Sequence, residues 1–103
     1  MFDHIKPDDR KLIYNRMFPR VREIMFREWD PIGVSDFADA PENEYDSYAT
    51  KVCGGLFNPA FTEEQCVAYL GEISSKRMLI APCEERDRRV ARALFALRDE
   101  FLR

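Results

Sequence analysis

The chain has 103 residues and a formal net charge of −3, with 46% hydrophobic and 34% charged residues. These values fit one globular domain and argue against intrinsic disorder. A sequence pI near 5.2 argues against dedicated nucleic-acid binding. No stretch approaches the ~18 uncharged apolar residues of a membrane span, and the start holds no apolar signal core. We therefore expect a single domain over 1–103 in the cytoplasm, with no membrane and no nucleic-acid partner.

Residues 7–29 show the spacing of an amphipathic helix. Pro7 opens it, and two acidic residues follow, which the positive end of a helix dipole favours. Pro19 interrupts the run because it cannot donate a hydrogen bond and crowds the preceding turn, so the pattern favours two helical pieces over one kinked helix. Asp30-Pro31 ends the run. The apolar face recurs at steps of three and four through Ile13, Met17, Val21, Ile24, Met25 and Trp29.

Residues 30–41 are rich in turn-forming types and predict a loop. A second helix is expected from about Pro41 or Glu42. Gly54 and Gly55 lie inside it, and each costs about 1 kcal/mol relative to alanine, for which close approach of a neighbouring helix would compensate. The apolar stripe of this helix is Tyr45, Tyr48, Ala49, Val52, Cys53 and Leu56.

Two further helices are expected in the second half of the chain. Thr62 and Gln65 have the spacing of a capping box, and the helix they open ends near Lys76-Arg77. Its apolar face is Cys66, Val67, Tyr69, Leu70 and Ile73. The last helix runs from about Glu84 to the end, with the stripe Val90, Leu94, Leu97 and Phe101. No segment alternates with a period of two. The sequence therefore predicts an all-α fold, a compact bundle of four main helices with room for an extra N-terminal helical piece.

Two blocks of sequence resemble a known family. The first contains Trp29-Asp30-Pro31-Ile32-Gly33-Val34, and the second is Asn43-Glu44-Tyr45-Asp46-Ser47-Tyr48. Together they resemble a group of small uncharacterised bacterial proteins, a domain of unknown function typified by the Bacillus protein YugE. The resemblance covers about residues 20–80, which makes residues 1–18 an N-terminal extension. It implies a small helical fold and assigns no activity. The motif residues, to which we assign a structural role, are Trp29, Asp30, Pro31, Gly33, Tyr45, Asp46 and Tyr48.

Charge is segregated along the chain. Residues 1–27 and 74–103 each carry a net charge of +3, whereas residues 28–73 carry −9. The structural interpretation is that basic outer helices attract acidic inner ones. The functional interpretation is an acidic patch that attracts a basic partner. Seven carboxylates crowd one stretch with no Lys or Arg between them: Glu28, Asp30, Asp36, Asp39, Glu42, Glu44 and Asp46.

The carboxylates of this stretch divide into two groups. Asp30 and Asp46 lie inside the motif, so we expect them to accept internal hydrogen bonds from tyrosine hydroxyls, loop N–H groups or the arginines Arg22 and Arg27. Asp36, Asp39 and Glu42 lie outside the motif on the expected loop, so we assign them to an exposed patch. The candidate partner-binding residues are Asp36, Asp39, Glu42 and Glu44.

Catalytic and metal sites have little support in the sequence. Cys53, Cys66 and Cys83 lack the spacing of zinc ligands and are interpreted as reduced thiols, so no metal and no cofactor is expected. His4 is the only histidine and lies near the N-terminus, so no nucleophile has a base and no catalytic residue is assigned. The arginines of the last helix are balanced by carboxylates, which favours a solvated helix over a nucleic-acid surface.

Two functional hypotheses follow. We favour a non-enzymatic protein-interaction module, such as an adaptor or an immunity-type inhibitor, that presents its acidic surface to an unknown basic protein partner. The chain is expected to be a monomer or a weak homodimer. The alternative is a small ligand- or metal-binding protein, or an enzyme, that uses the Trp29-Asp30 loop and the Tyr45-Asp46-Tyr48 region.

Overall fold

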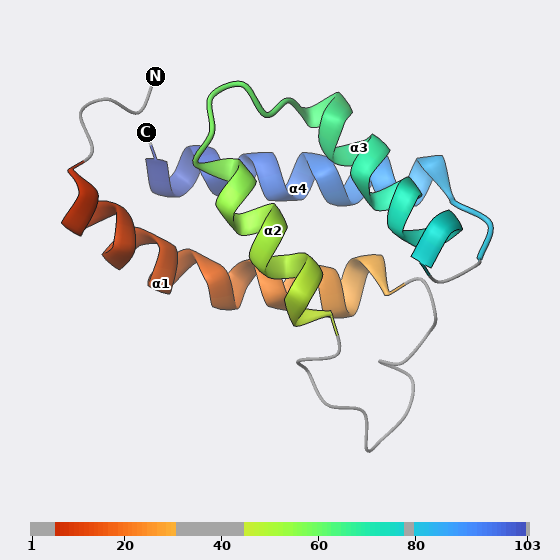
Figure 1. Cartoon of the computed structure of the whole chain (residues 1–103), viewed down its shortest axis with the longest axis horizontal. Helices are drawn as coiled ribbons and strands as arrows, with labels where there is room; N and C mark the ends of the chain where they lie inside the picture. The colour runs from red at the N-terminus through yellow and green to blue at the C-terminus, as the bar shows by residue number, and fades with distance from the viewer. Residues whose placement is uncertain (1–5, 31–44, 78–79, 103) are drawn as a thin grey trace, which may run out of the picture.

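The computed structural model describes residues 6–30, 45–77 and 80–102, and in these ranges all regular structure is helical. The four α-helices are α1 (Pro7–Ile24), α2 (Asp46–Leu56), α3 (Glu63–Glu72) and α4 (Glu84–Leu102). Two π-helical turns, η1 (Met25–Trp29) and η3 (Ile73–Arg77), extend α1 and α3. In Figure 1, α1 and α4 run antiparallel along the long axis, and α2 crosses in front of them. The predicted all-α bundle is confirmed.

The first helix is continuous through its internal proline. Pro7 lies in the first turn, and Pro19 lies inside α1 with its side chain exposed. The carbonyl of Asn15 loses its usual donor there, but Asn15 is exposed too, so water can satisfy that oxygen. Met17 and Val21 on the opposite face are fully buried and hold the helix on the core. The prediction of two helical pieces is therefore wrong.

The wide turn η1 ends the first helical run. The Asp30 N–H donates to the Met25 carbonyl at 3.0 Å, a bond that spans five residues. This turn buries Met25, Phe26 and Trp29 together. Asp30 then leaves the helix with φ of 28°, in the left-handed region that aspartate tolerates better than most residues. The predicted end of the helix at Asp30-Pro31 is confirmed on its described side.

The second helix begins later than predicted. Tyr45 is a non-helical cap residue with φ −106° and ψ 18°, and α2 starts at Asp46. A helix that runs from Pro41 or Glu42 through Tyr45 is therefore wrong. Residues 31–44, which include the predicted loop beyond Asp30, lie outside the described residues.

Only one glycine of the pair in α2 has the close neighbour that we expected. A Cβ on Gly55 would approach the Phe61 ring to 3.2 Å, so a larger residue there would require the ring to shift. The close neighbour is an aromatic ring from the segment after α2 and not another helix. A Cβ on Gly54 would meet nothing within 4 Å.

The ends of α3 follow from particular side chains. The Gln65 N–H donates to Thr62 Oγ1 at 3.1 Å, and the Thr62 N–H donates to Gln65 Oε1 at 3.0 Å, which confirms the capping box. At the other end, the Ser74 and Ser75 hydroxyls donate to carbonyls four residues earlier. Such bonds compete with the regular helical ladder and accompany its widening into η3.

The core lies between the long pair of helices and the two short ones. α4 packs against α3, α1 and η1, and α1 packs against α2. Within the described ranges, no helix combines the length and apolar character that crossing a membrane requires. The largest fully buried apolar side chains are Trp29, Met17, Met25, Leu56, Leu70, Ile73 and Leu94.

Candidate functional site

Trp29 lies where η1, α2 and α4 meet. Its side chain is 1% exposed, so it packs in the core and does not present a surface anchor. The indole Nε1 donates to Asp87 Oδ1 on α4 at 3.1 Å. The rings of Tyr45 and Tyr48 approach it edge-on, with centroids 5.2 and 6.2 Å away, a favourable geometry for aromatic pairs. Trp29 thereby joins three elements that are far apart in the sequence.

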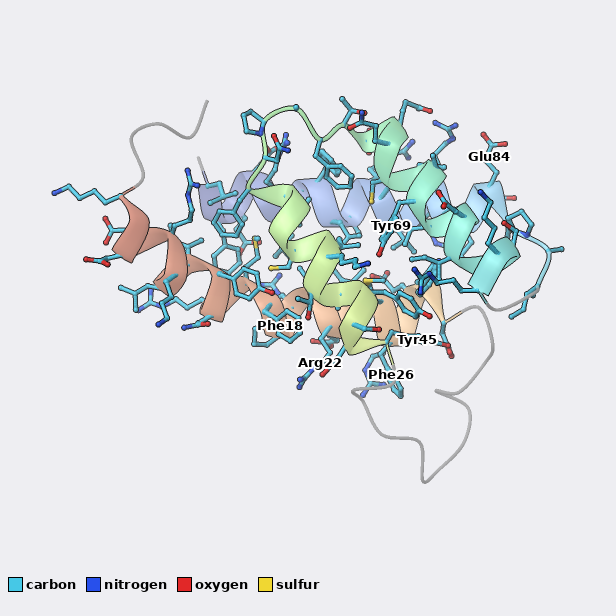
Figure 2. The ribbon with its side chains drawn as sticks, in the orientation of Figure 1. Phe18, Arg22, Phe26, Tyr45, Tyr69 and Glu84 are labelled. Atoms are coloured by element: carbon cyan, nitrogen blue, oxygen red, sulfur yellow. The ribbon has the colours of Figure 1, made fainter. Side chains whose placement is uncertain are left out.

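Two polar contacts hold the ends of segment 31–44 on the bundle. The Tyr45 hydroxyl donates to Asp30 Oδ1 at 2.6 Å, across the segment. Arg22 donates from Nε and Nη2 to the two oxygens of Asp46 at 2.9 and 2.8 Å, a paired geometry that arginine and carboxylate favour. Figure 2 shows Tyr45 at the start of α2, beside the end of the α1–η1 run. Two of the seven crowded carboxylates therefore have internal partners.

Of the other acidic residues in the stretch, the structure describes only Glu28. Glu28 is exposed on η1. The motif residues Pro31 and Gly33 lie outside the described residues, as do the candidate partner-binding residues Asp36, Asp39, Glu42 and Glu44. The structure therefore brings together Trp29, Asp30, Tyr45, Asp46 and Tyr48, which form the described part of the candidate site.

Asp87 is a site residue that sequence reasoning missed. It is 1% exposed, and burial raises its pKa, an effect that Arg86 and the Trp29 hydrogen bond partly offset. Arg86 Nε lies 3.7 Å from Asp87 Oδ1. A Cβ on Gly71 of α3 would lie 3.7 Å from the other carboxylate oxygen, so α3 passes close to this group. The available signal was its position three residues before Val90, on the apolar stripe of the last helix.

The described thiols are poor nucleophiles where they are buried. Burial raises the pKa of Cys53 and of Cys66 to about 12, whereas Cys83 is exposed. His4 lies outside the described residues. Among the described residues, no group of three His, Cys, Asp or Glu side chains is arranged to hold a metal ion. The described part of the chain thus shows the residues on either side of segment 31–44 held on the bundle, and no assembled reaction centre.

Comparison with known proteins adds no relative. No family model, no curated protein and no solved structure matches this chain. The family suggested by the Trp29–Val34 and Asn43–Tyr48 strings accordingly stays an expectation that rests on those residues.

Proposed function

We propose that this protein is a non-enzymatic interaction module whose acidic segment 31–44 binds a basic protein partner. The observation that carries the proposal is the Tyr45–Asp30 hydrogen bond of 2.6 Å, which joins the two ends of the segment. Between those ends the sequence has four carboxylates and no Lys or Arg. A frame that holds both ends of a charged segment suits recognition, because attraction between opposite charges speeds encounter and selects partners.

The division of labour among the carboxylates supports the proposal. Asp30 accepts a hydrogen bond from Tyr45, and Asp46 accepts hydrogen bonds from Arg22. These two carboxylates therefore hold the residues on either side of the segment in place. Segment 31–44 itself places four carboxylates in 14 residues with no Lys or Arg. Crowded like charges repel one another, and a basic partner would offset that repulsion. The raised pKa of Cys53 and Cys66 argues against thiol chemistry at these two buried residues, because the thiolate is the reactive form.

The test compares two variants of equal charge. The first is Asp36→Asn, Asp39→Asn and Glu42→Gln, which neutralises three carboxylates of the segment. The matched control neutralises exposed carboxylates on three helices: Glu23→Gln, Glu63→Gln and Glu85→Gln. Both variants and wild type are used as bait in native lysate, and captured proteins are identified by mass spectrometry.

The expected result is a basic protein that wild type and the control capture and the segment variant loses. Its association should weaken as ionic strength rises. The free energy of unfolding of the segment variant should lie within about 0.5 kcal/mol of the wild-type value, as for ordinary surface sites. If both variants lose the same proteins equally, net charge and not the segment is responsible, and the proposal fails.

A further inference from the structure

A polar hollow lies between α2 and the α3–η3 run, and its described lining residues all lie outside segment 31–44. Its volume is about 290 Å³, and it is better enclosed than the larger groove between α1 and α4. α2 contributes Tyr48 and Lys51, which are three residues apart and share a helix face. In Figure 2, Tyr69 projects from α3 toward α2. The residues from α3 and η3 that line it and carry the argument are Tyr69, Glu72, Lys76 and Arg77.

The polar groups of this hollow have one predominant charge. Among the described residues of the lining, Lys51, Lys76 and Arg77 are cationic, and Glu72 is the one carboxylate. Glu72 Oε1 lies 3.8 Å from Lys76 Nζ with both side chains mostly exposed, which is a weak pair. The lining therefore carries an excess of two positive charges within a chain whose net charge is −3. An excess of cations that the described lining residues do not neutralise favours the binding of an anion.

The walls between the cations are aromatic and apolar. Tyr48 and Tyr69 are half-buried, and Ile73 is buried beneath them. Burial is the largest cause that raises the pKa of Tyr69, while Arg77 lowers it, so the hydroxyl stays protonated and can donate to an anion. The backbone here is the π-helical turn η3, a form that occurs often at functional sites.

We propose that this hollow binds a small phosphate monoester, with the phosphate at the cationic rim and a compact organic body against the tyrosine rings. A phosphate group carries about −1.5 to −2 charges at neutral pH, which matches the excess of the lining. Arginine suits its oxygens by paired hydrogen bonds, and lysine by point charge. The volume lies at the lower limit of ligand pockets, which are roughly 300–1,000 Å³, so the body is small. The proposal does not rest on binding by segment 31–44, although Tyr48 belongs both to the motif around Trp29 and to this lining.

The test titrates the full ¹⁵N-labelled chain with three probes: phenyl phosphate, inorganic phosphate and neutral phenol. Phenyl phosphate should shift the amide resonances of Tyr48, Lys51, Tyr69 and Arg77. Inorganic phosphate should shift the same set with weaker affinity, and phenol should not bind. If phenol binds as tightly as phenyl phosphate, the hollow recognises only the apolar ring, and the phosphate site is refuted. Failure of phenyl phosphate to shift these resonances would overturn the proposal directly.

Variants separate this site from general electrostatics. Lys51→Gln with Arg77→Gln should raise the Kd for phenyl phosphate at least about tenfold. The control Arg89→Gln with Arg92→Gln removes two exposed cations of α4 and should change Kd less than about twofold. If the two double variants weaken binding equally, the phosphate senses net charge and the site is refuted.

A gain of binding gives the sharpest test, because a damaged fold does not improve affinity. Glu72→Gln removes the competing carboxylate and should lower the Kd for phenyl phosphate about two- to fivefold. Glu85→Gln on α4 is the matched control and should leave Kd unchanged. Unchanged or weaker binding by Glu72→Gln contradicts the assignment. A phosphotyrosine peptide that binds where phenyl phosphate does not would show that the occupant is a protein segment, which also overturns it.

Discussion

Replacing Trp29 with alanine should remove a large part of the stability of this domain. The side chain is 1% exposed, and truncating a buried Trp costs about 3–5 kcal/mol. The change also leaves the buried Asp87 carboxylate without the indole donor at 3.1 Å, which costs about 1–3 kcal/mol more. The two costs overlap, so we expect a total loss of about 4–6 kcal/mol. Domains of this size have a free energy of unfolding of about 5–15 kcal/mol.

The assay is urea denaturation followed by far-UV circular dichroism, with two comparison variants. Trp29→Phe keeps an aromatic ring and loses the N–H donor, so its cost should be about 1–3 kcal/mol. Glu85→Gln on the exposed surface of α4 should lie within about 0.5 kcal/mol of wild type. Glu85→Gln should be the most stable of the three variants, Trp29→Phe should be intermediate, and Trp29→Ala should be the least stable. The reasoning is refuted if Trp29→Ala unfolds at the same urea concentration as Glu85→Gln.

Three further outcomes follow from the described contacts. Tyr45→Phe deletes the hydrogen bond across the acidic segment and should lower the free energy of unfolding by about 1.5 kcal/mol, measured by urea denaturation; no change would show that the bond is replaced by water. A thiol reagent should label exposed Cys83 before buried Cys53 and Cys66, whose pKa is about 12, and equal rates in peptide mapping would contradict their burial. Burial raises the pKa of Asp87, so the folded state holds that proton more tightly than the unfolded chain. The stabilisation from this proton is fully present below the pKa of Asp87 in the unfolded chain and is lost as pH rises through its pKa in the folded state. The free energy of unfolding of wild type relative to Asp87→Asn should therefore fall across that pH range, and a constant difference would refute the shift.

Local patterns predicted most of the helices. The capping box at Thr62, the proline at Pro7 and the start of the last helix at Glu84 all depend on residues within one turn of each other. The apolar stripes likewise became the buried faces, since periodicity reports which side of a helix meets the core. Each of these signals lies within a short stretch of the sequence, so it can be read without the structure.

Features that depend on several elements were not visible in such windows. Whether Pro19 breaks a helix depends on which face is exposed, and only the packed bundle shows that this face meets water. The partner of Trp29 is 58 positions away, so no spacing rule connects it with Asp87. The polar hollow combines Lys51 with Arg77, which lie on different elements. Pairing of Tyr45 with Asp30 could be considered from the sequence, but the choice among several donors needed the structure.

The surroundings of Trp29 also give this protein a built-in optical reporter. The chain has one tryptophan, and the rings of Tyr45 and Tyr48 lie 5.2 and 6.2 Å from it. At such distances, excited tyrosines can pass their energy to the indole. Ultraviolet excitation of the folded protein should therefore yield tryptophan emission, shifted to short wavelength because the indole is buried. Tyr48 contacts both Trp29 and the polar hollow. A ligand that moves the Tyr48 ring would change the emission of Trp29, without any label attached to the chain.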